Sequence, residues 1–586
     1  MKQWSVWLAA TLLVFMATLA VLAANGDSAT YDEVAHIPAG YSYLVKQDYR
    51  LNPEHPPLIK DFAALPLLFL DLHFPEGNPA WTEATGERQW SFGRVFLYET
   101  GNNPDQILFW ARMSMVALLV FLGWFIFQWA RELAGTGGAL FALFLFAFSP
   151  TFLAHGHLVT TDIAAVFGFM LAMFFYLRFL QAPSFKSTML AGVTLGVALL
   201  LKFSTLLLLP FLGFLTLLYI WAIHNEHSRE FLVAKYIRGG LLVGSIALLI
   251  VGLVYQAHLV QYAPAQQVAD SKINLAEFYG VNPESISFPF TQNIFLRPYA
   301  HYIGGALIIL WRSSVSTVEY FLGSIGFSGW WYYFPALYLF KVPIAFHILG
   351  ILALFEGFVL IKHYRDSLKS FAQGHFVELS FFLFVALYTF MAVTNKTSIG
   401  IRHILPLFPF LYILVALGVK KWLAREIFFP WFKKGILAIL LGWYGISSLA
   451  SFPFYLSYYN ELAGGIQNGY KIAVDSNYDW GQDMKRLVVW MDEHDVQMVY
   501  LDYFGKGNPE QYYLPARYMH WRGSWRWGEQ RESGDTFPRP NYLAVSATLL
   551  QGGRWNGLAF ERNYAWLDSY EPVGRAGSSI FVYYID

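Results

Sequence analysis

Long apolar stretches alternate with short polar ones over the first three quarters of the chain. A hydrocarbon layer about 30 Å thick is crossed by about 20 apolar residues of helix. Runs near that length occur about eleven times, at residues 4–24, 107–130, 138–153, 162–180, 188–201, 204–223, 239–258, 331–361, 377–393, 404–419 and 435–453. The pattern therefore predicts a polytopic α-helical membrane protein with about eleven transmembrane helices.

The loops between these runs differ in charge. Lysine and arginine lie in alternate short loops, at 131–137, 181–187, 224–238, 362–375 and 420–434, and the last three of these are distinctly basic. Short basic loops stay on the cytoplasmic side, so the N-terminus is predicted inside. The odd number of spans then places three large segments outside, at 25–106, 259–330 and 455–586. The first run could also be a signal peptide, but its length and the functional-looking residues after it favour a retained anchor.

The last 132 residues, 455–586, have a different pattern. They are polar, with short alternating segments that predict strands at 496–503, 541–547 and 579–584 and a helix at 482–494. No solenoid repeat or low-complexity tract occurs. We therefore predict a membrane module at 1–454 and a small extracytoplasmic α/β domain at 455–586.

Composition narrows the chemistry. Apolar residues make up 56% of the chain, whose mean hydropathy is +0.40, so water is not its main solvent. Forty basic and 40 acidic residues give a net charge of zero, which implies no general attraction to nucleic acid. The absence of cysteine excludes disulfides, thiolate metal sites and cysteine nucleophiles.

The first outer segment begins with two adjacent acids, Asp32 and Glu33. Carboxylates just beyond a span are partly desolvated, which raises the pKa toward that of a useful general base. One acid could then take a proton from an acceptor hydroxyl while its neighbour orients the acceptor. An equally good interpretation is that both complement a helix dipole. His55, held extended by the two prolines that follow it, is more often structural than catalytic when alone.

A second outer turn carries His155, His157, Thr161 and Asp162 directly before an apolar helix. Asp162 could orient an acceptor or join the histidines at a metal, whereas Thr161 and Asp162 also suit a helix N-cap. Two histidines are too few for zinc unless an outer carboxylate joins them. A divalent metal is therefore possible but not indicated, and no cofactor is predicted.

Basic residues are scarce in the outer loops, so each one is informative. Lys202 lies in a very short outer turn, where a lone cation either snorkels to a lipid headgroup or meets an anion. Arg402, followed by His403, offers a planar fork suited to phosphate, and Lys60 could add a third charge. These cations are predicted to converge on one phosphate group.

These residues together resemble the protein O-mannosyltransferase family and its bacterial relatives, the phospholipid-carrier-dependent glycosyltransferases that include aminoarabinose transferases. The resemblance rests on Asp32-Glu33, on the 52–60 segment with its His-Pro-Pro-Leu core, and on Thr161-Asp162. The aromatic run 330–335, Lys341-Val342-Pro343 and Arg402-His403 are similar to the bacterial group. The resemblance covers the membrane part of the chain.

The resemblance implies a GT-C fold and an inverting transfer of a sugar from a polyprenyl-phosphate carrier. It makes Asp32 the general base, Glu33 its partner and Asp162 a second acidic site residue. His55, Lys60, Lys202, Arg402 and His403 become substrate-binding residues, with Lys202 and Arg402 on the donor phosphate. The expected partners are the lipid donor, the bilayer and an acceptor protein or glycolipid, at the cytoplasmic membrane of a bacterium.

Two other functions compete with this interpretation. A secondary transporter would carry ionisable residues at the bilayer midplane and often an inverted repeat, neither of which is evident. An export subunit for a cell-envelope polymer would need the outer domain but not the acidic pair.

The stretch 475–482, Asp-Ser-Asn-Tyr-Asp-Trp-Gly-Gln, is typical of the bacterial group, and either a ligand loop or a domain-docking turn fits it.

Overall fold

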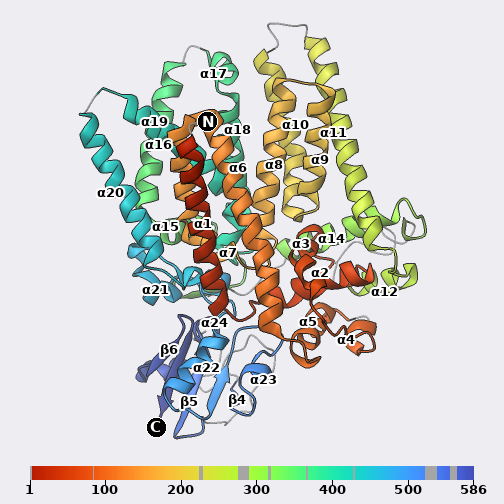
Figure 1. The fold of residues 1–586 in the computed structure, drawn as a ribbon, viewed down its shortest axis with the longest axis vertical. Coiled ribbons are helices and arrows are strands. Elements are labelled where there is room, and N and C mark those ends of the chain that lie inside the picture. The colour runs from red at the N-terminus through yellow and green to blue at the C-terminus, as the bar shows by residue number, and fades with distance from the viewer. Residues whose placement is uncertain are drawn as a thin grey trace.

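The structure, a computed structural model, describes residues 3–83, 85–223, 229–274, 290–314, 319–364, 367–426, 429–521, 537–554 and 564–586. The basic loops predicted at 224–238, 362–375 and 420–434 lie partly outside these residues. Figure 1 shows a bundle of long helices with the N-terminus at one end and the C-terminal sheet at the other. Helices α2 to α5 lie at the sheet end, whereas α17 (Leu368–Gly374) lies at the N-terminal end. The predicted inner and outer segments thus occupy opposite ends of the bundle.

Eight helices among the described residues are long and apolar enough to cross a membrane. They are α1 (Gln3–Gly26), α6 (Pro104–Ala147), α8 (Asp162–Gln181), η3 with α10 (Phe203–Leu207, Leu208–Ile223), α11 (Arg229–His258), α16 (Ile344–His363), α18 (Phe376–Thr394) and η4 with α19 (Ile401–Leu407, Phe408–Ala424). The other predicted runs lie on the second half of α6, the shorter α9 (Phe185–Leu199) and α20 (Pro430–Leu449). The polytopic helical fold is confirmed, with eight helices rather than about eleven reaching the length and hydropathy of a span.

Two features of the bundle depart from simple apolar runs. Helix α6 is broken at Gly135, whose φ of 77° is outside the helical region. The two halves of α6 fold back on each other, as shown by the close approach of Gly123 to Phe146: a Cβ on Gly123 would lie 3.0 Å from the Phe146 ring. The predicted run 331–361 is two helices, α15 (Tyr333–Lys341) and α16, since Pro343 disfavours helical backbone at Val342.

Short elements at the sheet end position the polar residues. The first outer segment folds into α2 (Glu33–Lys46), α3 (Leu58–Ala64), η1 (Leu65–Phe69), α4 (Pro79–Thr82), α5 (Arg88–Arg94) and a π turn, η2 (Val95–Glu99). Helix α7 (Pro150–His155) precedes the second outer turn. Helices α12 (Pro264–Asn274) and α14 (Arg297–Ser314) and the hairpin β1–β2 (Glu319–Phe321, Ser324–Gly326) belong to the 259–330 segment.

The C-terminal region contains a five-stranded mixed sheet in the order β4-β3-β5-β7-β6. The predicted strands are β3 (Val499–Asp502), β5 (Asn541–Ser546) and β7 (Ile580–Ile585), and the predicted helix is α22 (Met484–Glu493). The edge strands β4 (Tyr518–His520) and β6 (Gly574–Ala576) were not predicted, because three residues are too few for a period-two pattern. Strands β3, β4 and β5 are parallel, whereas β7 is antiparallel to β5 and β6. The predicted α/β character is confirmed.

The chain from 455 to the sheet, together with the segments that follow its strands, adds only short helical elements. They are η5 (Tyr455–Ser457), η6 (Glu461–Ala463), α21 (Gly465–Asn468), η7 (Gly469–Lys471), η8 (Asp475–Asn477), α23 (Glu510–Tyr513), α24 (Ala547–Gly552) and η11 (Ala565–Ser569). Residues 455–482 contact the membrane helices as well as the sheet, since Asn460 donates to Leu339 O and Val342 O at 2.6 and 2.8 Å.

Asp479 gives this region a pH-dependent stability. Burial raises the pKa of its carboxyl to about 7, although hydrogen bonds from Thr548 oppose the rise. The folded protein then binds a proton that the unfolded chain has released, so stability is highest below pH 4 for this group and falls as the pH rises toward 7. Asp479→Asn is expected to raise the unfolding temperature at pH 8 by roughly 2–6 °C and by less at pH 5. Thermal unfolding of the purified protein at both pH values measures this. Asp568→Asn, at an exposed acid of the same region, is the control, and an equal gain at both pH values would contradict the prediction.

Candidate active site

Four charged side chains meet at the sheet end of the bundle, and we call them the four-charge cluster: Asp32, Asp162, Lys202 and Arg402. Lys202 Nζ lies 2.5 Å from Asp162 Oδ1. Arg402 Nη1 lies 2.7 Å from Asp32 Oδ2 and 3.5 Å from Asp162 Oδ2. Asp162 therefore bridges two cations, and Arg402 links two acids that are 130 residues apart in the chain.

Each member of the cluster stands at the end of a helical element. Asp32 precedes α2, Asp162 begins α8, Lys202 lies between α9 and η3, and Arg402 is in the first turn of η4. Neither acid caps its own helix with its side chain, because Asp32 makes no capping bond and the N-cap of α8 is Thr161. The carboxylates bond to cations from other elements, which is a tertiary rather than a local arrangement.

The cluster is only partly open to solvent. The side chain of Asp162 is fully buried, while those of Lys202, Arg402 and Asp32 are 13%, 12% and 19% exposed. Opposite charges interact more strongly where water is excluded. Asp32 is thus the most accessible member of a neutral cluster whose other acid is sealed beneath the two cations.

Four histidines lie close to the cluster. The rings of His36 and His55 are 5.5 Å apart, and His36 Nδ1 faces Val159 O at 3.0 Å. His55 Nδ1, His155 Nδ1 and His403 Nε2 are buried without a hydrogen-bond partner among the described residues. Burial lowers the pKa of His55 well below its usual value and that of His155 to about 3. These two rings are therefore neutral at pH 7 and can donate or accept a hydrogen bond from a bound molecule.

Arg402 also lies over an aromatic ring from the C-terminal region. Its Cζ lies 4.3 Å from the centre of the Trp480 ring, and Trp480 is 2% exposed. The sequence singled out the stretch that contains Trp480 but not this contact, because a cation–π pair between residues 402 and 480 has no local signal.

Glu33 was predicted to be the partner of Asp32, but its carboxylate is fully used by a buried ion pair. Arg112 Nη2 lies 2.7 Å from Glu33 Oε2 and Arg112 Nε donates to Oε1 at 2.9 Å. The backbone N–H groups of Thr30 and Val159 donate to the same two oxygens. With both oxygens occupied, Glu33 has no free site for an acceptor, and we replace the predicted role with a structural one.

Removing the charge of Glu33 is expected to destabilise the fold. Breaking a buried ion pair by neutralising one partner costs about 3–5 kcal/mol, since the other charge stays buried and unpaired. Glu33→Gln should therefore lower the unfolding temperature and the yield of folded protein. Glu132→Gln, at the exposed pair with Arg178, is the control and should change stability by less than about 1 kcal/mol. Equal effects of the two substitutions in a thermal-unfolding assay would refute the structural role.

Lys60 was predicted to add a third charge to a bound phosphate, and the structure contradicts this. Its Nζ donates to Asn52 O, Asn52 Oδ1 and His55 O at 2.8–2.9 Å and lies 3.1 Å from Tyr43 Oη. An ammonium group has only three protons to donate. Burial also lowers the pKa of Lys60 to about 7. Lys60 thus holds the 52–55 turn, which carries His55 toward the cluster.

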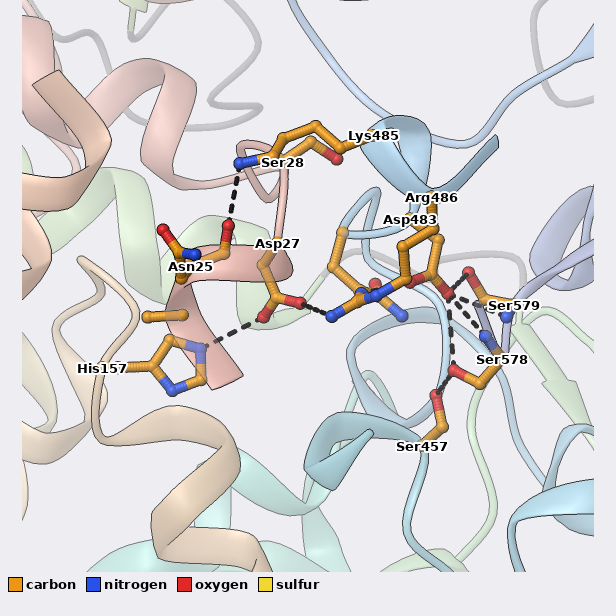
Figure 2. A network of polar contacts seen from close by, with 12 residues as sticks. Asn25, Asp27, Ser28, His157, Ser457, Asp483, Lys485, Arg486, Ser578 and Ser579 are labelled. Carbon is orange, nitrogen blue, oxygen red and sulfur yellow. Dashed lines mark hydrogen bonds and ion pairs between the residues drawn. The ribbon is translucent and has the colours of Figure 1, made fainter. Parts of the chain in front are cut away.

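A polar network joins the C-terminal region to the membrane helices (Figure 2). Asp27, just after α1, lies 2.8 Å from Arg486 Nη2 through Oδ1 and 3.2 Å from His157 Nε2 through Oδ2. Burial would raise the pKa of Asp27, but Arg486 and His157 outweigh it and hold the pKa below its usual value. Arg486 in turn bonds to Asp483. The network ties helix α22 to the first outer segment and to the second outer turn.

Asp483 extends the network into the sheet. Its Oδ2 accepts from the backbone N–H groups of Ser578 and Ser579 at 3.0 and 2.9 Å and from Ser579 Oγ at 2.8 Å.

His157, one of the two histidines considered as metal ligands, serves in docking through its contact with Asp27. No group of three or more His, Asp or Glu side chains that could hold a metal occurs in the part of the chain that the structure describes.

Comparison with known proteins supports the family resemblance. A family model described as dolichyl-phosphate-mannose-protein mannosyltransferase matches residues 94–255. This segment includes Asp162 and Lys202, whereas Asp32 and Arg402 lie on either side of it. The match confirms the resemblance predicted from the sequence and glycosyltransferase as the enzyme class. A comparison with curated proteins finds no match.

Solved structures show only a distant likeness. ArnT from Cupriavidus metallidurans bound to undecaprenyl phosphate is 13% identical, with a TM-score of 0.44 over 99% of this chain and 97% of that one. The oligosaccharyltransferase of Archaeoglobus fulgidus with a tethered acceptor peptide is 13% identical, with a TM-score of 0.45 over 99% and 74%. In another structure of that enzyme, with zinc and sulfate, the match has 15% identity and a TM-score of 0.40 and spans 82% of this chain but only 55% of the archaeal one.

Proposed function

We propose that this chain transfers a sugar from a polyprenyl-phosphate carrier to an acceptor outside the cytoplasmic membrane of a bacterium. Its family-model match supports a membrane glycosyltransferase of the protein O-mannosyltransferase superfamily. The observation that carries the proposal is the four-charge cluster, in which an accessible acid and two cations meet at one end of a membrane bundle. Transporters instead place such groups at the midplane of broken helices.

The two cations of the cluster suit the phosphate of the donor. Lys202 and Arg402 are both held by Asp162, which fixes their positions before a ligand arrives. Arg402 Nε is buried without a partner among the described residues, so the guanidinium keeps a donor for a phosphate oxygen. Pre-positioned charge that matches a developing anion is usually the largest catalytic contribution of a site.

Asp32 is the general base of the proposed reaction. Arg402 holds its Oδ2, and the 19% exposure of the side chain leaves the carboxylate accessible to an acceptor. The acceptor oxygen forms a bond to the anomeric carbon, and its proton passes to Asp32. The bond between that carbon and the phosphate oxygen breaks, and the bonding pair leaves with polyprenyl phosphate. Attack opposite the phosphate inverts the anomeric centre.

The proposal is tested with the purified full-length chain in lipid nanodiscs. A panel of polyprenyl-phosphate sugars, each labelled in the sugar, is incubated with bacterial envelope extract as the source of acceptors. The expected result is transfer of label to a protein, glycolipid or glycan and equimolar release of polyprenyl phosphate. Sugar movement across proteoliposomes without cleavage of the carrier bond would instead establish the transporter alternative.

A further inference from the structure

One strip of chain, residues 475–483, lies between the two sides of the four-charge cluster. Its side chains are almost completely buried: Ser476, Asn477, Asp479 and Asp483 have no exposed surface and Gln482 has 3%. The strip precedes α22 and belongs to the C-terminal region, and it contacts the membrane module as well as the rest of that region. Neither the proposed chemistry nor the docking network of Figure 2, which includes Asp483, assigns a role to the central residues of the strip.

On one side, the strip holds the turn that carries Arg402. Asn477 Oδ1 accepts from the backbone N–H of Ile401 at 2.9 Å, which is the first N–H of η4. Ser476 Oγ donates to Ile399 O at 3.0 Å. The approach is close, since a Cβ on Gly400 would lie 2.4 Å from Ser476 Oγ. These contacts fix the start of the 3-10 turn in the absence of a side-chain cap from Gly400.

On the other side, the strip pairs with the segment that ends in Asp32. The Tyr31 N–H donates to Trp480 O at 3.0 Å, and the Ser28 N–H donates to Gln482 O at 2.9 Å. Ser28 Oγ also donates to Gly481 O at 3.0 Å. The residue directly before Asp32 is therefore bonded to the residue whose ring contacts Arg402.

The Trp480 ring completes the link between the two sides. The ring lies 4.3 Å from Arg402 Cζ. The backbone N–H of Trp480 donates to Gln482 Oε1 at 2.8 Å, so both the side chain and the backbone of Trp480 are held. A guanidinium over an indole ring is attracted by the ring quadrupole, most strongly where water is excluded. The ring lies against Arg402 and so limits the positions that the guanidinium can take beside Asp32.

We infer that the 475–483 strip is a positioning element of the active site and that Trp480 is the residue that orients Arg402 for the donor phosphate. This inference rests on the proposed function. It makes the C-terminal region part of the donor site, beyond the docking turn that its sequence allowed. Trp480 acts through Arg402 and touches no substrate in this role.

The test compares two lipids that differ only in charge. Undecaprenyl monophosphate and undecaprenol are titrated onto the full-length protein in detergent, and bound lipid is measured by native mass spectrometry. The ratio of the two affinities reports phosphate recognition alone, because general damage to the fold weakens the binding of both lipids equally. Trp480→Leu is expected to lower this ratio about tenfold, while Trp480→Phe, which keeps a ring, restores most of it.

Two further variants sharpen the result. Trp490→Leu makes the same substitution in α22, away from Arg402, and should leave the ratio unchanged. Asn477→Ala removes the acceptor for the Ile401 N–H and should lower the ratio with the Trp480 ring still present. Wild-type discrimination by Trp480→Leu, or an equal loss in Trp490→Leu, overturns the inference. If the wild-type protein does not prefer the phosphate, the proposed donor site fails and the inference falls with it.

Discussion

Asp32→Asn is expected to lower sugar transfer about 100- to 10,000-fold, the usual contribution of a general base. Asparagine keeps an oxygen for the bond from Arg402 but cannot take the acceptor's proton. Asp32 is also the most exposed member of the cluster and makes no capping bond to α2, so folding and membrane insertion should be preserved. The loss should appear in kcat, measured as release of polyprenyl phosphate from a labelled donor.

The matched control is Asp71→Asn, at an exposed acid of the same outer segment. It should transfer sugar at the wild-type rate. Binding of undecaprenyl monophosphate should be unchanged in Asp32→Asn, because the substitution leaves Lys202 and Arg402 in place. Near-normal transfer by Asp32→Asn would remove Asp32 from the proposed mechanism.

Most of the membrane fold could be predicted from the sequence, because span length and loop charge are local properties. The predicted runs fall on helices, including the two halves of α6 on either side of Gly135. Pro343 also signals the break between α15 and α16, but the apolar residues on both sides of it led to the prediction of one continuous run. The edge strands of the C-terminal sheet could not be predicted, since their existence depends on partners distant in sequence.

The members of the four-charge cluster could be predicted one at a time, because charges are rare next to apolar helices. Their partners could not. Glu33 and Asp32 are neighbours in sequence, yet one bonds to Arg112 and the other to Arg402. Nothing near Lys60 signals that backbone carbonyls of its own loop satisfy its ammonium group. Sequence identifies the ionisable groups, whereas tertiary packing decides which of them remain available to a substrate.

Arg402→Gln is the second substitution expected to have a large effect. It removes the charge that contacts Asp32, Asp162 and the proposed donor phosphate, so kcat should fall about 100- to 1,000-fold, as for loss of one pre-positioned donor to a developing anion. Arg402→Lys keeps the charge but loses the planar fork and the fit to Trp480, so its activity should be intermediate. The order wild type, lysine, glutamine is the specific expectation.

Affinity for undecaprenyl monophosphate separates this prediction from that for Asp32. Arg402→Gln should lose phosphate affinity as well as turnover, whereas Asp32→Asn should lose turnover alone. Arg178→Gln, at the exposed pair with Glu132, is the control for loss of one surface arginine and should behave as wild type in both assays. If Arg402→Gln and Arg402→Lys bind the lipid phosphate as tightly as wild type, Arg402 serves only to hold Asp32, and Lys202 alone would have to match the charge of the leaving phosphate.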